Sequence, residues 1–447
     1  MRGRYILILA ALLSCVSCLK DDKSYNTPHA AITSFTIGYY NVSFHDMNIR
    51  GRDTLVNIRE AGAMYPMTID QVNNRIFNAD SMAYGSDLSR VTTSVYGTGT
   101  IGYRYLDDPS VEYLWKSYDS IDFTRGIQFL AKSTDLSFTR VYDVQVNIRK
   151  IFPDSLIWSA PDTTAFPVLS GVTSVIRNDS LFCFGTDTNG VPSVSFRSIS
   201  AGKWNGANAM TGITASGWSH RVTMNNGTFY TVSGGSVYGS DDAVNWSSVK
   251  SGIKSLIVAG EDYGTLWAVS EDGNLLKSSD MTEWTTVQAV PDNFPDSAAV
   301  MFTYPLPTNP SLTRSVLAGL ADDSLNASVW TILSGDTVWS QVDMPYNIDL
   351  RLPAAHDLTV FRYDDAMFSL GGGLEGFRQS NDNGITWYMC DSYVEDYSSW
   401  NRYMQLPSAL KGYASGFTAA TDSKGYIWIM TDDGHVWRGA ISRLIKK

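Results

Sequence analysis

The larger, C-terminal part of the chain repeats itself, and this repetition constrains the fold more than any other feature. Residues 227–246 read GTFYTVSGGSVYGSDDAVNW, and residues 264–284 read GTLWAVSEDGNLLKSSDMTEW. Each copy contains an apolar strand, a turn with Gly, a second strand, a Ser/Asp turn and a Trp that opens a third strand. This order is typical of one blade of a β-propeller.

Further copies extend the repeat through the rest of the chain. They end at Trp204, Trp339 and Trp387, and a last copy at 425–437 stops before its Trp-led outer strand. The segment 154–159 resembles the Trp-led segments of other copies. We therefore expect it to pair with the final blade and to close the ring, since a closed ring leaves no open sheet edge. The count is six blades, with seven as the alternative.

The copy at 380–387, SNDNGITW, matches the Asp-box pattern Ser-x-Asp-x-Gly-x-Thr-Trp in full. In such a turn the side chains of Ser380 and Asp382 satisfy backbone N–H groups, and Gly384 supplies a positive φ. Trp387 is expected to bury its ring against the neighbouring blade. We interpret the Asp-box as a structural staple.

Short alternating or β-branched runs precede the repeats. They lie at residues 32–37, 67–69, 75–77, 91–95, 127–130 and 141–148, with turn-rich pieces between them. This spacing predicts a β-sandwich, in keeping with an all-β composition that is 12% aromatic. The order resembles the immunoglobulin-like domains at the front of Bacteroidetes surface lipoproteins, and this resemblance implies a spacer.

The N-terminus reads as an export signal. Two arginines precede the apolar run 5–13, which is too short to span a bilayer, and small residues follow it. Ser-Cys pairs at Cys15 and at Cys18 both suit cleavage before a lipidated cysteine. Leu12, three residues before Cys15, favours cleavage at Cys15. The sequence after Cys18, Lys-Asp-Asp at 20–22, resembles the surface-export signal of Bacteroidetes lipoproteins, so we favour Cys18.

Four segments follow from these signals. They are a lipoprotein signal peptide at 1–17, a tether at 18–30, an immunoglobulin-like β-sandwich at 31–150 and a β-propeller at 151–447. We expect the protein to be anchored by lipid in the outer membrane, facing the cell exterior, as a monomer or as part of an envelope complex.

Charge and cysteine usage narrow the partners. The formal net charge is −11, which disfavours nucleic acids and anionic lipid head groups. Membrane attachment is therefore expected through the N-terminal lipid only. Beyond the signal, Cys183 and Cys390 form either one disulfide or two buried thiols.

The sequence holds no recognised catalytic set, so we expect neither a metal nor a cofactor. The histidines lack the close spacing of zinc ligands; they are His29, His45, His220, His356 and His435. Asp-boxes invite comparison with sialidases, but the nearest string to their arginine motif, Phe196–Ile199, lacks the Pro. Acidic pairs at 322–323, 364–365 and 432–433 suit glycosidic chemistry only if they converge, and turns use the same residues.

An aromatic insertion between the fifth and sixth blades is the best binding candidate. It contains Tyr388, Tyr393, Tyr397, Trp400 and Tyr403. Aromatic faces on loops suit sugars or protein partners, but such rings also cover exposed core edges. The leading hypothesis is a non-catalytic propeller that binds a glycan or a surface protein. A propeller glycosidase or lyase, and a structural subunit of an envelope complex, remain as alternatives.

Overall fold

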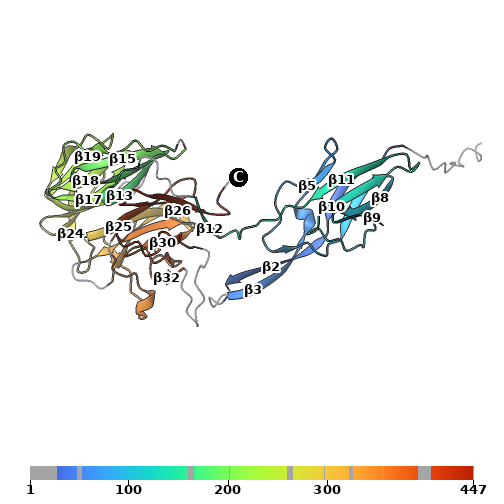
Figure 1. The fold of residues 1–447 in the computed structure, drawn as a ribbon. Helices are drawn as coiled ribbons and strands as arrows, with labels where there is room; N and C mark the ends of the chain where they lie inside the picture. Colours follow the sequence, from blue (N-terminus) through green and yellow to red (C-terminus); the bar gives the residue numbers. More distant parts are fainter. Residues whose placement is uncertain are drawn as a thin grey trace, which may run out of the picture. The chain divides into compact units, whose positions relative to one another are not determined.

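The computed structural model describes residues 28–47, 53–159, 166–200, 202–258, 265–295, 297–321, 326–355, 357–390 and 404–445. These residues form two compact units, and the chain passes from the first unit to the second between Ile151 and Phe152 (Figure 1). Strands dominate both units, and the helical elements described are two short 3-10 turns, η1 (Gly62–Met64) and η2 (Ile348–Leu350). No helix in the described part of the chain is long and apolar enough to cross a membrane.

The first unit contains three sheets. The first pairs β1 (Ala31–Ile37) with β7 (Thr93–Thr98), and the second has the order β3 (Asp53–Ala61), β2 (Tyr39–Met47), β6 (Ser86–Asp87). The third has the order β4 (Met67–Asp70), β5 (Arg75–Asn78), β11 (Thr139–Gln145), β10 (Ile127–Lys132), β8 (Thr100–Tyr105), β9 (Asp108–Leu114). Six of these strands lie where the alternating runs predict them, whereas the β2–β3 hairpin was not predicted.

A shared core joins β1 to the six-stranded sheet. Ile32, Phe35 and Ile37 are buried, and the ring of Phe35 meets that of Phe129 on β10 edge to face at 5.0 Å. Gly38 separates β1 from β2, and a Cβ there would lie 2.4 Å from the hydroxyl of Thr92. The close approach at Gly38 lets one continuous segment leave one sheet and enter another.

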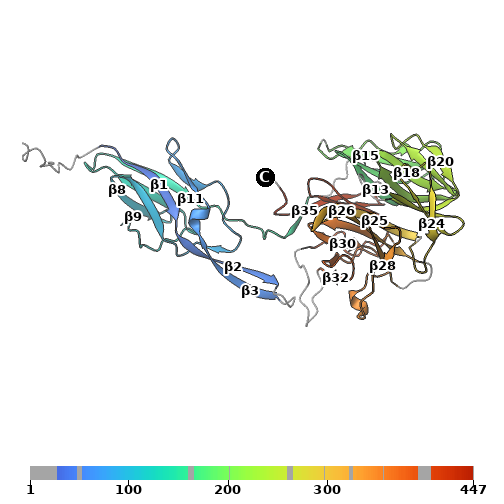
Figure 2. The same ribbon diagram turned by 180° about the vertical axis from the view of Figure 1, so that it is seen from behind.

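The described residues of the second unit form six four-stranded antiparallel sheets (Figures 1 and 2). Five contain consecutive strands: β13 (Ser170–Arg177), β14 (Ser180–Thr186), β15 (Pro192–Ser198), β16 (Asn208–Ala209); β17 (Trp218–Asn225), β18 (Thr228–Ser233), β19 (Ser236–Ser240), β20 (Ser247–Ser251); β21 (Ile253–Val258), β22 (Leu266–Ser270), β23 (Asn274–Ser278), β24 (Thr285–Ala289); β25 (Ser297–Leu306), β26 (Asn309–Leu320), β27 (Ser328–Leu333), β28 (Ser340–Gln341); and β29 (Thr359–Tyr363), β30 (Ala366–Leu370), β31 (Arg378–Ser380), β32 (Tyr388–Met389).

The sixth sheet combines both ends of the unit. It contains β33 (Phe417–Thr421), β34 (Ile427–Thr431) and β35 (Val436–Ile441), and its outer strand is β12 (Leu156–Ser159). Trp158 lies opposite Gly439, where a Cβ would approach the indole to 2.7 Å, so only Gly fits under the ring. This pairing is the one that the repeats predict.

Each Trp that precedes an outer strand packs against the sheet before its own. Trp246 meets Phe184 edge to face at 6.2 Å, and Trp339 meets Trp267 at 5.7 Å. Trp204 shares a buried cluster with Trp428 of the sixth sheet, and Trp158 shares one with Phe377 of the fifth. The six sheets therefore follow one another in a closed ring.

The Asp-box turns before Trp246, Trp284 and Trp387 share one hydrogen-bond pattern. In the full copy the Ser380 hydroxyl bonds to Asp382 at 2.8 Å and accepts the N–H of Gly384 at 2.9 Å. Trp387 donates its indole N–H to the Gly384 carbonyl at 3.0 Å. Trp246 and Trp284 repeat this last bond with Ala243 and Met281, so shortened copies keep the same geometry.

Candidate functional site

The ring encloses a central cavity of about 550 Å³. Its wall includes residues from the first strand of every sheet, β13, β17, β21, β25 and β33, and from the start of β29. Ligand sites of comparable size, about 300–1,000 Å³, are common in proteins. The cavity is therefore the strongest candidate for a binding site in the described part of the chain.

Hydroxyl groups and two charges give this cavity its chemistry. The hydroxyl-bearing residues of its wall are Thr173, Ser174, Ser219, Thr223, Tyr230, Ser255, Thr359 and Thr418. Among the described residues of the wall, only Arg221 and Asp357 carry a formal charge when histidine is neutral. A wall of this kind offers many hydrogen bonds, one cation and one anion.

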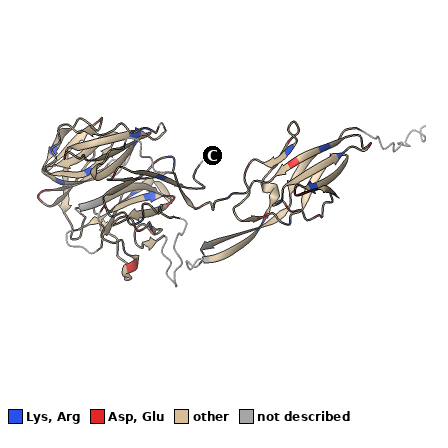
Figure 3. Ribbon diagram, in the orientation of Figure 1, with Lys and Arg blue, Asp and Glu red and all other residues tan. Residues whose placement is uncertain are grey.

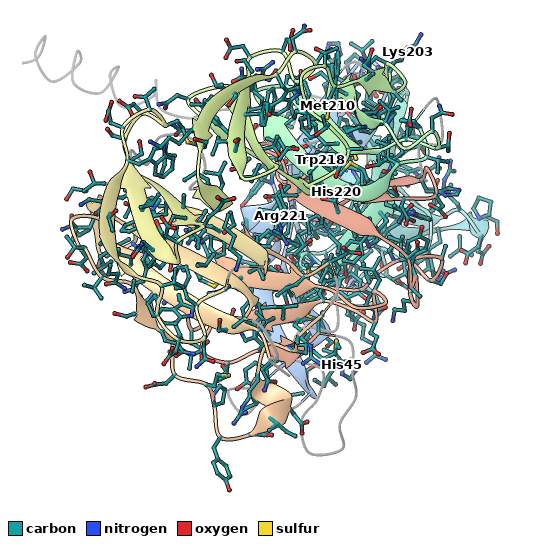
Figure 4. The ribbon with its side chains drawn as sticks, turned by 90° about the vertical axis from the view of Figure 1, so that its left-hand side faces the viewer. His45, Lys203, Met210, Trp218, His220 and Arg221 are labelled. Carbon is teal, nitrogen blue, oxygen red and sulfur yellow. The ribbon has the colours of Figure 1, made fainter. Side chains whose placement is uncertain are left out.

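The start of β17 is bulged toward the cavity. Trp218 pairs with Ser233 and Val222 pairs with Thr231, so the three residues 219–221 lie opposite the single residue Val232. Figure 4 labels Trp218, His220 and Arg221, which follow one another along this segment. Bulges re-aim side chains, and this one brings His220 and Arg221 to the cavity wall.

Two hydrogen bonds fix the bulge. The hydroxyl of Thr231 donates to the Arg221 carbonyl at 2.5 Å, and the indole N–H of Trp218 donates to that hydroxyl at 2.9 Å. Thr231 is buried, so its hydrogen bonds are shielded from water. The Arg221 backbone is thereby held in place from the core side.

His220 adopts a left-handed backbone, with φ of 53°. Its ring lies 4.5 Å from that of Trp218, and a Cβ at Gly171 would approach Nδ1 to 2.4 Å. A left-handed conformation costs a non-glycine residue about 1–2 kcal/mol. Strain of this kind is often concentrated at functional sites.

Burial shifts the titration of both residues of the bulge. Desolvation lowers the pKa of the Arg221 guanidinium, and the Asp357 carboxylate opposes that shift. Arg221 stays charged nonetheless, because arginine is not deprotonated in proteins. The Arg221 side chain is surrounded by protein but is still exposed, because its accessible surface faces the cavity. Burial also lowers the pKa of His220, which favours its neutral form.

The residues singled out in the sequence lie elsewhere or outside the described residues. Tyr388 is half-buried in β32 opposite Gln379 and is not part of the cavity wall. Tyr393, Tyr397, Trp400, Tyr403 and Cys18 lie outside the described residues. The Asp-box residues belong to the turns between the third and fourth strands, away from the cavity wall.

The acidic pairs at 364–365 and 432–433 do not belong to the cavity wall, and the pair at 322–323 lies outside the described residues. Asp364 bonds to Arg443, which also bonds to Asp154 at 2.6 Å. Asp432 accepts the Tyr413 hydroxyl and, at 2.9 Å, the N–H of Gly416. Both carboxylates thus hold turns together.

Arg197, of the string compared with the sialidase motif, is also structural. It is buried with its guanidinium 5.6 Å from the Trp204 ring and 5.1 Å from the Trp428 ring. No disulfide joins Cys183 and Cys390, both of which are buried.

No group of three or more potential metal ligands occurs in the described ranges. Basic and acidic residues are scattered over the strands and loops of both units (Figure 3).

The sequence did not single out Arg221 or Asp357. The repeats align the second to fourth strands of each sheet, whereas the cavity is walled by first strands, which vary between copies. A signal was nevertheless present, since the segment before the 227–246 copy carries adjacent His and Arg.

A closed ring of four-stranded sheets around a central cavity defines a β-propeller protein, here preceded by a separate β-rich unit. Residues 152–447 match the DUF6242 beta propeller domain, and residues 35–146 match the N-terminal domain of the same family, described as a domain of unknown function. The chain belongs to this family. None of the curated proteins matches its sequence.

Several solved structures match the chain at low similarity. A putative phosphatase from Bacteroides thetaiotaomicron is 9% identical, with a TM-score of 0.42, over 84% of this chain and 97% of that one. The Aleuria aurantia lectin in complex with alpha-methyl-L-fucoside is 12% identical, with a TM-score of 0.38, over 64% and 98%. A putative gluconolactonase is 10% identical, with a TM-score of 0.37, over 64% and 91%.

Proposed function

We propose that this protein is a surface-exposed lipoprotein whose propeller binds a glycan in its central cavity without chemical turnover. The supporting observation is the cavity wall, in which eight hydroxyl-bearing residues surround Arg221 and Asp357. Sugars present many hydroxyl groups, and such a wall can both donate hydrogen bonds to them and accept hydrogen bonds from them.

Binding rather than hydrolysis is favoured by the number of carboxylates. Glycosidases of the usual kind place two carboxyl groups on either side of the scissile bond. Among the described residues of the cavity wall, Asp357 is the single carboxylate. A second carboxylate, Asp432, lies near Asp357 at Gly416 but outside the wall, and it accepts hydrogen bonds from the Tyr413 hydroxyl and the Gly416 N–H.

The proposal extends to architecture and location. The six sheets support a six-bladed propeller, and β12 supports its closure. We further propose that the first unit is an immunoglobulin-like spacer and that lipid on Cys18 anchors the chain in the outer membrane, facing outward. The export signal and the short tether after it support this location.

A glycan array tests the binding function. The full mature chain is expected to bind a subset of glycans, and Thr418→Val, which removes a cavity hydroxyl, is expected to weaken that binding. Trp400→Ala tests the aromatic insertion separately. An array without any bound glycan contradicts the proposal, and loss of binding only in Trp400→Ala moves the site from the cavity to the insertion.

One surface loop favours a protein partner as a second candidate function. In the loop after β28, Tyr346 is 100% exposed and Met344 is also exposed, and Ile348 at the start of η2 is 68% exposed. Exposed apolar side chains that gather on one loop are typical of protein interfaces. A pull-down from envelope extracts that loses the same partner in Tyr346→Ala/Ile348→Ala would support this role, and an unchanged partner profile would contradict it.

A further inference from the structure

The first strands of neighbouring sheets provide an internal control for the bulge in β17. In β13, residues 171–172 lie opposite Gly185, and in β21 the register shifts by one residue between Ile253 and Ser255. In β17, three residues lie opposite one. The β17 bulge is therefore larger by one residue than those of its neighbours on either side.

This additional residue has a chemical result. Among the described residues of the cavity wall, the enlarged bulge supplies the single arginine, whereas β13 and β21 contribute hydroxyl and apolar side chains. A bulged strand and a left-handed His220 both cost free energy. That cost is understandable if the position of Arg221 serves ligand recognition.

The guanidinium of Arg221 defines the group that it would recognise. Its planar fork matches a carboxylate through two parallel hydrogen bonds, and such charge-assisted bonds are about twice as strong as neutral ones. Desolvation by the surrounding protein disfavours the charged guanidinium and lowers its pKa. An anion beside Arg221 would offset this desolvation penalty by charge attraction, and a neutral hydroxyl would offset it less.

The remaining groups restrict the ligand further. Asp357 also lies in the cavity wall and interacts electrostatically with Arg221, so the two formal charges sum to zero. A phosphate monoester carries close to two negative charges at neutral pH and would be repelled by Asp357. A single carboxylate on a polyhydroxylated ligand fits better, because its hydroxyls can donate to Asp357.

One pair of hydroxyl groups in the wall matches the hydroxyls of such a ligand. Ser174 on β13 and Thr418 on β33 are hydrogen-bonded to each other at 2.9 Å. The hydroxyl of Ser255 on β21 is buried and has no hydrogen-bond partner among the described residues. That oxygen has almost no accessible surface, so the Ser174 and Thr418 hydroxyls carry the match to a sugar hydroxyl.

We propose that the central cavity recognises an acidic sugar, a uronic acid residue, whose carboxylate binds Arg221 and whose hydroxyls bind Asp357 and the surrounding Ser and Thr side chains. This inference rests on the proposed glycan binding and names the class of glycan.

Calorimetric titration of the full mature chain tests the inference. The probes are glucuronic acid and galacturonic acid, compared with glucose and galactose at the same ionic strength. At least one acidic sugar is expected to bind about tenfold or more tightly than its neutral counterpart, and its affinity is expected to fall with added salt.

Variants locate the effect. Arg221→Gln is expected to weaken the acidic sugar about tenfold or more, and Arg221→Lys, which keeps the charge without the fork, to weaken it less. Lys254→Gln is the matched control, because it removes a charge from the β21 bulge outside the cavity wall. It is expected to change the affinity less than twofold. Circular dichroism of each variant verifies that it is folded.

The outcomes distinguish acidic-sugar recognition from the glycan binding on which it rests. Neutral and acidic sugars that bind equally, or an acidic sugar that binds Arg221→Gln as tightly as the parent, would overturn the acidic-sugar inference and leave glycan binding intact. A parent chain that binds neither these probes nor any glycan on the array would overturn both.

Discussion

The Asp-box turns of three sheets repeat much more closely than the first strands, which wall the cavity in all six sheets. At the turns, Ser240, Ser278 and Ser380 each bond to an aspartate two residues later. At the first strands, the register shift differs from β13 to β17 and is absent from β29. One region is thus nearly invariant within the chain, and the other is not.

The difference has a physical basis. Each Asp-box turn has to present a tryptophan to the preceding sheet, and the same hydrogen-bond pattern does so before Trp246, Trp284 and Trp387. The first strands also contribute buried residues such as Val222 and Val360 to the clusters between sheets, but their bulges at the cavity differ from sheet to sheet. Within this chain, repetition identifies the packing elements, and divergence identifies the candidate site.

Removing an Asp-box tryptophan should have the largest effect on stability. Trp387 is 1% exposed, and Trp387→Ala is expected to lower the free energy of unfolding by about 3–5 kcal/mol, because it leaves a large cavity between two sheets. Denaturant unfolding measures this. Ile385→Ala is the control, since Ile385 is 45% exposed and its loss should cost less than about 0.5 kcal/mol. Similar losses in both variants would contradict the role given to the tryptophan.

A substitution at Gly171 tests the candidate site at its backbone. Gly171→Ala is expected to cost about 1–3 kcal/mol, because φ is 60° and the new Cβ would lie 2.4 Å from His220 Nδ1. Gly190→Ala is the matched control, since φ is 78° but no atom lies within 4 Å of its Cβ. Unfolding free energies that are equal for the two variants would show that His220 can shift without cost. Weaker sugar binding in Gly171→Ala alone would tie the position of His220 to the site.

The shortened Asp-boxes should be sensitive to acid. Backbone N–H groups of the turn lower the pKa of Asp242 and of Asp280 to about 2, the first bonded by Asn245 and the second by Glu283. Since these values lie below the unfolded value of about 3.9, the stabilisation is complete above that pH and is lost as the pH falls toward 2. Unfolding free energies measured from pH 6 to pH 2 should decline less steeply in Asp242→Asn/Asp280→Asn. A double variant with the slope of the parent chain would refute this assignment.

Loss of the arginine in the cavity should have the smallest effect on stability. Arg221→Gln is expected to change the free energy of unfolding by less than about 0.5 kcal/mol, because the side chain faces the cavity and the buried bond at this residue is made by its backbone carbonyl. Thermal and denaturant unfolding check this. A loss as large as that of Trp387→Ala would make Arg221 a packing residue and remove the contrast between the two regions.

The sequence alone determined the strands and the order in which they are used. Alternating residues at 32–37 and 127–130 predict β1 and β10, and the copies ending at Trp246 and Trp284 predict three of the four strands in their sheets. The pairing of β12 with β35 was predictable as well, because an unfinished last copy and an isolated Trp158 segment complement each other. All of these signals are local patterns, or patterns that recur at a fixed spacing.

Only the tertiary structure revealed the cavity. Arg221 belongs to β17 and Asp357 precedes β29, and nothing in the spacing of these residues relates them. They share a wall because the ring closes and brings the first strands of all six sheets around one axis. The bulge that aims Arg221 was also hidden, since a register shift depends on which residues of β18 lie opposite, and a single strand does not carry that information.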